Sequence, residues 1–359
     1  MCEDLLLSSN DVRAGFLPGL TFGYKAVTYS VVDDLAIYEG CIVLDTAERM
    51  EQISADIRRT IEEAGEDPDD VEHGVGITGN RFRWPNRLMP YSIDPNLSNQ
   101  ARVTDAIAHW EAHTAFRFVE INAGNADQFP NFVHFRPAGG CFSNVGMQLG
   151  RQDIGLADGC STGATIHEIG HAVGLWHEQS REDRNQFIRV NFQNIQPGRE
   201  HNFNQHIIYG DDIGDYDYDS IMHYGAFAFT RNGLPTITVL QPGRTIGQRT
   251  RLSTGDIAAV SAMYPSGDPA ISAPKPGATF NDSAVTFEWT SNGAVVQQWW
   301  LYAGSTVGAS DLFNSGSLGT RRSTTVHGLP TDSRDVFVRL WYRIGSVWEF
   351  SDNQYTASS

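Results

Sequence analysis

The stretch HEIGHAVGLWH at residues 167–177 constrains this chain more than any other feature of its sequence. On a helix, side chains four positions apart share one face, so His167 and His171 would present their rings together. Gly174 can end such a helix by adopting a positive φ, and the returning chain would bring His177 up as a third imidazole. Three histidines arranged in this way predict a Zn²⁺ site, with one ion per chain.

Three protein ligands leave one position of a tetrahedral zinc ion open for water, which is typical of a catalytic rather than a structural site. Glu168 lies between the first two histidines, next to the metal but not needed as a ligand. A bare HExxH occurs by chance on ordinary amphipathic helices, whereas the full eleven-residue spacing is far more specific. The sequence therefore predicts a catalytic zinc centre.

The motif continues as HEQSREDR at residues 177–184, and YDYDSIMHY follows at residues 216–224. Both stretches resemble signatures of the astacin family of metzincin metallopeptidases, HExxHxxGxxHExxRxDR and the SxMHY Met-turn. The resemblance covers about residues 75–266. It implies an α+β fold with two lobes: an upper lobe with a mixed sheet and the active-site helix, and a more irregular lower lobe across the substrate cleft.

The resemblance also implies a role for each matching residue. The three histidines match the zinc ligands, and Glu168 matches the general base. Met222 matches the methionine that packs beneath the metal. Tyr224 matches a tyrosine that serves as a further, displaceable zinc ligand and then as an oxyanion hydrogen-bond donor, although a packed core tyrosine is the alternative interpretation.

These groups together predict peptide-bond hydrolysis without a covalent enzyme intermediate. Zinc lowers the pKa of a bound water to about 7. Glu168 would take the water proton and later pass it to the leaving amine. Zinc and Tyr224 would stabilise the charge on the tetrahedral oxygen. The expected substrates are therefore proteins or peptides.

The first part of the chain is strongly acidic. Residues 1–74 hold 17 acidic and 5 basic side chains, so they carry a net charge of −12 out of −17 for the whole chain. A solvated acidic surface would explain this, but the resemblance implies an inhibitory pro-segment that is removed by an activating protease or by the chain itself. Trp84 in FRWPN resembles a tryptophan near the start of mature astacins, which places the mature start near Val75. Glu178 matches the carboxylate that receives the new N-terminus, with an exposed surface carboxylate as the alternative.

The stretch IYEGCIVLD at residues 37–45 places a cysteine far from any obvious partner. Astacin pro-segments carry F-x-G-D, whose aspartate binds the zinc, and Tyr38 to Cys41 fit this pattern with cysteine in place of aspartate. Gly40 would let the backbone approach the cleft closely, and thiolate is a strong zinc ligand. We therefore predict that Cys41 completes the coordination in a latent zymogen. A buried unpaired cysteine and a Cys2–Cys41 disulfide are the alternatives.

Cys141 and Cys160 stand where the family has a disulfide. The family's second disulfide has no cysteines here, so the lower lobe is either looser or held by packing. A disulfide implies an oxidising compartment. The start MCEDLLLSSNDV shows no signal peptide, which would fit either a cytosolic protein or a sequence from which the signal peptide has been removed. Because the disulfide favours secretion, we expect a secreted protein whose signal peptide has been removed from this sequence.

The predicted domains are the pro-segment at 1–74, the zinc metallopeptidase at 75–266 and an all-β accessory domain, a sandwich, at 267–359. The proline-rich joint Pro265–Pro276 is the expected linker. Short alternating strands follow it, with turn signals between them, and their tryptophans are expected in the core rather than at a ligand site. Helices are expected at about residues 46–64, along the face of 103–114, at 161–174 and at AAVSAMYP.

Other classes of function are disfavoured. The net charge of −17 argues against a nucleic-acid partner, and no apolar run reaches the roughly 18 residues of a membrane span. A catalytically inactive protease-like binding or adhesion protein is the competing hypothesis. Loss of Glu168 or of a ligand histidine would support it, but all of these residues are present. Arg244, Arg249 and Arg251 are expected to line a pocket for acidic side chains after the scissile bond, unless they are ordinary surface arginines.

Overall fold

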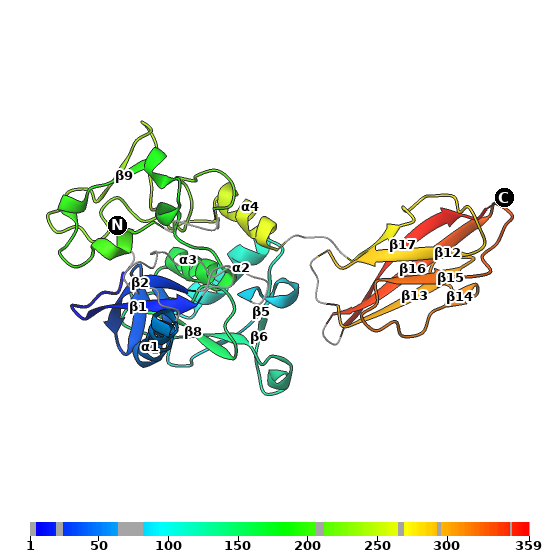
Figure 1. The fold of residues 1–359 in the computed structure, drawn as a ribbon, viewed down its shortest axis with the longest axis horizontal. Helices are drawn as coiled ribbons and strands as arrows, with labels where there is room; N and C mark the ends of the chain where they lie inside the picture. Colours follow the sequence, from blue (N-terminus) through cyan, green and yellow to red (C-terminus); the bar gives the residue numbers. More distant parts are fainter. Residues whose placement is uncertain are drawn as a thin grey trace. The chain divides into compact units, whose positions relative to one another are not determined.

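The structure is a computed structural model, which describes residues 5–18, 24–63, 82–205, 212–264, 269–292, 296–344 and 347–358. The chain divides into two compact units, Met1–Met263 and Tyr264–Ser359 (Figure 1). The division falls next to the proline-rich joint, while the three domain ranges expected from the sequence stay a prediction. Among the described helices, none is both long and apolar enough to cross a membrane.

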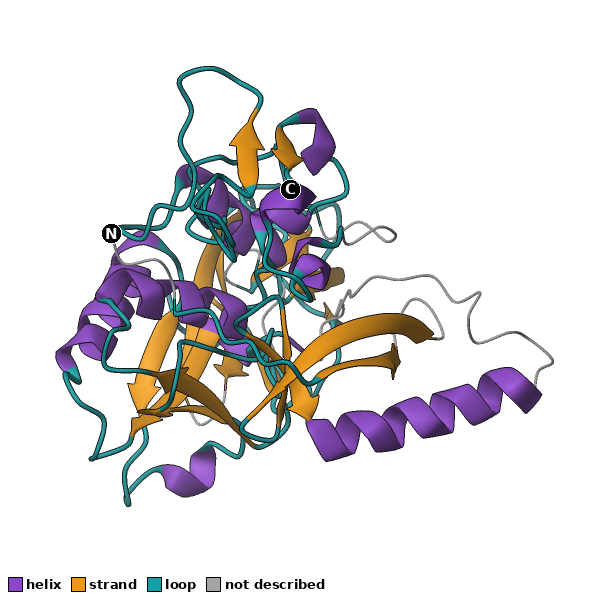
Figure 2. Cartoon of the chain, turned by 90° about the vertical axis from the view of Figure 1, so that its left-hand side faces the viewer, coloured by secondary structure: helices purple, strands orange, loops and turns teal. Residues whose placement is uncertain are grey.

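Residues 12–63 form an antiparallel sheet followed by a helix. The strands pair in the order β1 (Val12–Pro18), β2 (Tyr24–Val32), β3 (Leu35–Tyr38) and β4 (Ile42–Thr46). Buried and partly exposed residues alternate along the first part of β2, as expected of a strand with one face on a core. The helix α1 (Ala47–Glu63), the long helix of Figure 2, follows β4 directly and packs against β1. It confirms the helix expected at 46–64.

The core of this first sheet continues into the domain that follows it. Cys41 and Val43 belong to one buried cluster with Phe142 and Val145. The backbones also pair, because Val43 N–H donates to the Ser143 carbonyl at 2.8 Å and Ser143 N–H donates to the Cys41 carbonyl at 2.9 Å. The start of β4 is therefore attached to Ser143 on both sides of Ile42, the residue that directly follows the cysteine.

A four-stranded parallel sheet and two helices form the next part of the chain. The strands pair in the order β6 (Arg117–Glu120), β5 (Leu88–Ile93), β7 (Phe132–Pro137) and β8 (Arg151–Leu156). The helices α2 (Ala101–His113) and α3 (Thr162–Val173) pack together at the expected positions. The family resemblance implies a mixed sheet in this lobe. Among the described residues, all pairs of named strands in this sheet are parallel, and the antiparallel pairing is limited to one isolated bridge between Phe142 and Gly155 of β8.

The chain beyond α3 is mostly irregular up to α4 (Thr254–Met263), which confirms the helix expected at AAVSAMYP. The strands β9 (Ile188–Val190) and β10 (Ile237–Val239) pair antiparallel. An aromatic cluster that includes Phe203, Tyr216 and Phe229 packs inside this lobe. Of the two alternatives for a lobe without the second family disulfide, this cluster supports the one in which packing holds the lobe together.

The expected disulfide joins Cys141 and Cys160. The 3-10 turns are η3 (Pro85–Arg87), η4 (Ala126–Gln128), η5 (Glu178–Ser180), η6 (Arg184–Gln186), η7 (Phe192–Asn194) and η8 (Glu200–Phe203).

The second unit contains two antiparallel sheets. One pairs β11 (Ala270–Ala273), β12 (Val285–Thr290) and β15 (Ser323–Val326). The other pairs β14 (Phe313–Asn314), β13 (Gln298–Gly304), β16 (Asp335–Ile344) and β17 (Val347–Thr356). Buried residues of both sheets form one cluster. The α+β class with a β-rich C-terminal unit is thereby confirmed.

The tryptophans of this unit do not all lie in its core. Trp289 and Trp299 are buried, with ring centroids 5.9 Å apart. Trp300 and Trp341 lie directly opposite each other on β13 and β16 and are only partly buried, and Trp348 is 37% exposed. Successive residues of a strand face opposite sides of the sheet, so a Trp299 that points inward turns Trp300 outward. The expectation of core tryptophans is wrong for these outward-facing three.

Candidate metal centre

The helix α3 and the turn after it place three imidazoles at one point. Ser161 caps the helix by accepting a hydrogen bond from Ala164 N–H at 3.0 Å. Every residue from 163 to 173 is buried, so His167 and His171 point into the protein rather than into solvent. The helix ends at Gly174, whose φ of 122° is the positive value expected from the sequence. The chain then returns with His177, which is also buried.

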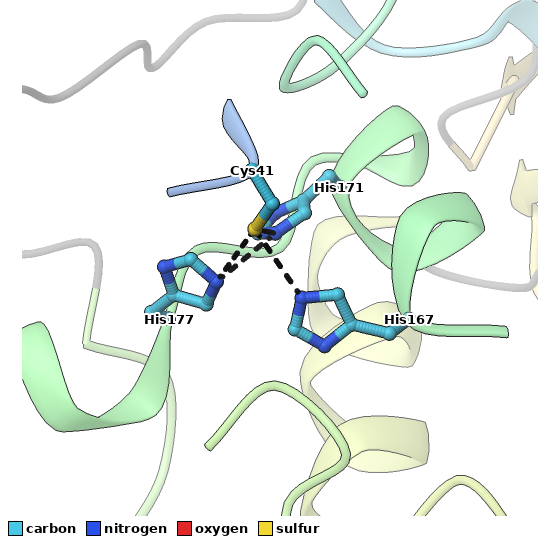
Figure 3. A group of neighbouring side chains, drawn as sticks. All are labelled: Cys41, His167, His171 and His177. Carbon is cyan, nitrogen blue, oxygen red and sulfur yellow. Dashed lines mark hydrogen bonds between the residues drawn. The ribbon is translucent and has the colours of Figure 1, made fainter. Parts of the chain in front are cut away.

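Cys41 faces the three rings (Figure 3). Its Sγ lies 3.7 Å from His167 Nε2, 3.4 Å from His171 Nε2 and 3.2 Å from His177 Nε2. The four side chains are buried, and their ligand atoms lie within 4.8 Å of one another. Cys41 carries a thiol rather than a disulfide. The structure therefore brings the four predicted ligands together from parts of the chain more than 120 residues apart.

Each imidazole is oriented through its other nitrogen. His167 Nδ1 lies 2.8 Å from the Ile221 carbonyl, and His171 Nδ1 lies 2.8 Å from the Leu175 carbonyl. A carbonyl only accepts, so both rings carry their proton on Nδ1 and direct the Nε2 lone pair at the shared point. Burial lowers the pKa of both histidines well below the usual value, which keeps them neutral.

The Cys41 sulfur and the nitrogens of His171 and His177 have the spacing of ligands that share one zinc ion, and all four ligand atoms lie within 4.8 Å of one another. A tetrahedral zinc bonded at about 2.0–2.1 Å to nitrogen and about 2.3 Å to sulfur holds its ligands roughly 3.3–3.6 Å apart. The Nε2 atoms of His171 and His177 are 3.2 Å apart, close to that spacing, and the sulfur distances above bracket it. Imidazole nitrogen and thiolate sulfur are also the donors that zinc prefers.

A comparison with known protein families agrees with this centre. Residues 76–265, more than half of the chain, match the family model Astacin, which describes a peptidase family. The chain belongs to the astacin family. The resemblance seen in the two sequence motifs is thereby confirmed, and zinc is the cofactor that the donor set and the family have in common.

Several astacin relatives are similar over the same part of the chain. Protein SpAN of Strongylocentrotus purpuratus is 38% identical over 192 residues, which cover 51% of this chain and 31% of that protein. Blastula protease 10 of Paracentrotus lividus is 41% identical over 192 residues, which cover 51% and 32%. The chain thus spans about a third of the length of these relatives. Among solved structures, high choriolytic enzyme 1 of Oryzias latipes, a hatching enzyme zinc-protease, is 32% identical with a TM-score of 0.49, covering 54% of this chain and 98% of that one.

The other predicted active-site residues of the astacin domain lie around the imidazoles. Glu168 is buried on α3. Met222 is buried beneath that helix, and a Cβ added to Gly170 would come within 2.7 Å of its Sδ, so the missing side chain makes room for it. The Tyr224 ring lies 4.8 Å from the His177 ring, between centroids.

Glu178 is not an exposed carboxylate. It accepts a hydrogen bond from Asp217 N–H at 2.8 Å and lies 3.6 Å from the Arg181 Nε. Burial raises the pKa of Glu178 to about 8. Trp84 is buried, and its Nε1 donates to the Ala172 carbonyl at 2.7 Å. The expected mature start at Val75 lies outside the described residues, as does Cys2.

The three arginines expected at a substrate pocket have different surroundings. Arg249 donates to the carbonyls of Ile221 at 2.7 Å and His223 at 2.9 Å, so its guanidinium supports the Met-turn. Arg244 is exposed and lies over the Tyr218 ring at 5.9 Å, and Arg251 is exposed. Their role toward substrate stays a prediction.

Asp256 is a supporting residue that the sequence interpretation missed. Its buried carboxylate accepts hydrogen bonds from Ser220 Oγ at 2.7 Å and from Ile221 N–H at 2.9 Å, both in the Met-turn, and from Ser253 N–H at 2.8 Å. Ile221 in turn orients His167. The signal was present in LSTGDIAAV, because Ser253 and Asp256 have the spacing of a capping box at the start of α4.

We predict that Asp256→Ala destabilises the astacin domain by at least about 2 kcal/mol, because buried Met-turn donors lose their shared acceptor. The measurement is urea unfolding of the full chain. Asp219→Ala is the matched control, since Asp219 lies in the same turn region with its side chain exposed, and it should change the free energy of unfolding by less than about 0.5 kcal/mol. Equal unfolding midpoints for the two variants would contradict the role of Asp256.

Proposed function

We propose that this chain is a secreted zinc endopeptidase of the astacin type that is kept latent by Cys41. The observation that carries the proposal is the Cys41 sulfur, which lies 3.2–3.7 Å from three metal-binding nitrogens. The substrates are proteins or peptides. The Cys141–Cys160 disulfide supports an oxidising, extracellular location.

The catalytic roles follow from the chemistry of the residues. Zinc supplies a Lewis acid that makes water nucleophilic near neutral pH. Glu168 takes the proton of the attacking water and delivers it to the leaving amine. Tyr224 donates a hydrogen bond to the oxyanion that forms on the substrate carbonyl. The histidines hold their positions through their Nδ1 hydrogen bonds.

Latency follows from what Cys41 and its neighbours occupy. Bound to zinc, the Cys41 thiolate would exclude the water that the reaction needs. The Tyr224 hydroxyl donates to the Glu39 carbonyl at 2.5 Å, so the pro-segment also engages the oxyanion donor. Gly40 permits this approach, since its φ is 70° and an added Cβ would lie 2.8 Å from Phe229 Cζ. Of the alternatives for Cys41, the Cys2–Cys41 disulfide finds no support, because Cys41 carries a thiol.

Activation removes the acidic pro-segment. We propose a cut near residues 73–77, made by another protease or by the chain itself, after which the new amino group pairs with Glu178. The pKa of Glu178 is raised because burial disfavours its negative charge more than the neighbouring Asp217 N–H and Arg181 stabilise it. An incoming ammonium group would stabilise that charge.

The first prediction from the proposed function concerns the general base. In activated enzyme, Glu168→Ala should retain zinc and lose activity by at least about 10²-fold, because proton transfer in the transition state is removed. Peptide hydrolysis and zinc content are measured on the same samples. Glu120→Ala changes an exposed carboxylate of the same domain and should keep full activity. Substantial turnover by Glu168→Ala would remove Glu168 as the base.

The second prediction concerns latency. Full-length Cys41→Ala should cleave a fluorogenic peptide, or process itself, well before the parent does. Cys2→Ala removes the other cysteine of the same segment and should stay latent. Zinc-edge absorption should detect a sulfur ligand in the parent and none in Cys41→Ala. A Cys41→Ala chain as latent as the parent, or a parent without zinc–sulfur bonds, would refute the cysteine switch.

The third prediction concerns the activation site. N-terminal sequencing of the active enzyme should find a start within residues 73–77, and Glu178→Gln should lower the activity of the processed form because the new ammonium loses its counter-charge. A mature start well outside this window would be evidence against the proposed pairing.

A further inference from the structure

Glu39, two residues before Cys41, is wholly buried at the centre of the site. One carboxylate oxygen lies 2.7 Å from His177 Nδ1, and the other accepts a hydrogen bond from Ser180 Oγ at 2.6 Å. A carboxylate is this deeply buried only where it has close hydrogen-bond partners. These contacts join the pro-segment to the third metal ligand by a route that does not involve the cysteine.

The three ligand histidines differ in what holds their second nitrogen. His167 and His171 each donate to a backbone carbonyl of the astacin domain, that of Ile221 and that of Leu175. His177 instead donates to Glu39, which belongs to the segment expected to leave on activation. One of the three orienting bonds is therefore supplied by a removable part of the chain.

The backbone around Glu39 is shaped to make these contacts. Glu39 has a φ of 46° and Gly40 a φ of 70°, so two consecutive residues adopt left-handed conformations. Such a conformation is unfavourable for a glutamate unless its surroundings enforce it. Its carbonyl accepts from Tyr224, and its carboxylate reaches across to His177 and Ser180. Both polar ends of this residue thus contact the astacin domain.

We propose that Glu39 is a positioning residue through which the pro-segment orients His177 and strengthens zinc binding in the proform. The inference rests on the proposed latent zymogen and adds a second attachment to the Cys41 ligand. A carboxylate that accepts from the far nitrogen of a ligand histidine fixes its tautomer and raises its basicity, and loss of such a partner commonly lowers metal affinity roughly 10–100-fold. The proform therefore holds zinc more tightly than coordination by Cys41 alone explains, and release of the segment weakens two supports of the ion together.

The test measures zinc affinity by competition with a chromogenic chelator in full-length chains that also carry Glu168→Ala, so that they stay uncut. Glu39→Gln should lower the affinity roughly 10–100-fold, both with Cys41 present and in combination with Cys41→Ala. Glutamine keeps the size of the side chain, but its amide NH₂ would face either His177 Nδ1–H or the Ser180 hydroxyl, both of which donate to Glu39. Glu62→Gln is the matched control, because it removes the same charge from an exposed position of the same segment.

Histidine NMR distinguishes positioning from general loosening. With ¹⁵N-labelled histidine and zinc bound, the Nδ1–H signal of His177 should shift in Glu39→Gln, while those of His167 and His171 stay in place because their carbonyl acceptors are unchanged. If Glu39→Gln does not fold, Ser180→Ala serves instead. It removes one donor to Glu39 and should cause a smaller decrease of zinc affinity with the same selective shift.

The outcomes separate the two proposals. Zinc affinity within twofold of the parent in Glu39→Gln, or equal shifts of all three histidine signals, would overturn the role of Glu39. If Glu39→Gln behaves as expected while Cys41→Ala leaves zinc affinity and latency unchanged, the positioning role stands and the cysteine switch falls.

Discussion

Three buried imidazoles can share one ion only if each ring is held through the nitrogen that faces away from it. The remainder of the site serves this condition. The cap at Ser161 and the end of α3 at Gly174 fix the positions of His167 and His171 on the helix and of the turn that leads to His177. The Met-turn, supported by Asp256 and Arg249, presents the carbonyl that holds His167. Burial lowers the pKa of His167 and His171, which keeps these two rings neutral and so available to a metal.

The residues of the site differ in how far sequence alone could predict them. His167, His171 and His177 follow from one helix and one turn, and the geometry of such a local segment is set by its own spacing. Cys41 was predictable only through the family pattern of the pro-segment, because nothing local connects it to residues more than 120 positions away. Glu39 stood in the same short motif, but its hydrogen bonds to His177 and Ser180 depend on how two distant segments pack.

The same distinction applies to the fold. The helix α2 was predictable because its apolar residues Val103, Ile107 and Trp110 recur with the helical period. Several strands were not predicted, since short strands take much of their stability from neighbours that a single segment does not reveal. These are β1, β3, β4, β8, β9, β10, β11 and β14. The pair Trp299 and Trp300 shows an avoidable error. A strand directs adjacent side chains to opposite faces, so two consecutive tryptophans cannot both enter one core.

In the proposed zymogen, the covalent link between the pro-segment and the astacin domain keeps several separate contacts together. The segment contributes a thiol to the metal site, a carboxylate to His177 and apolar side chains that pack with Phe142 and Val145. While the chain is intact, these contacts re-form at a high effective concentration whenever one of them opens. A single cut changes this rebinding into an encounter between two molecules. Glu39 and Cys41 are two residues apart in the turn between β3 and β4, so neither can stay behind when the other leaves. Proteolysis can therefore remove the thiol from the metal site and the carboxylate from His177 in one step, without altering any bond in the astacin domain itself.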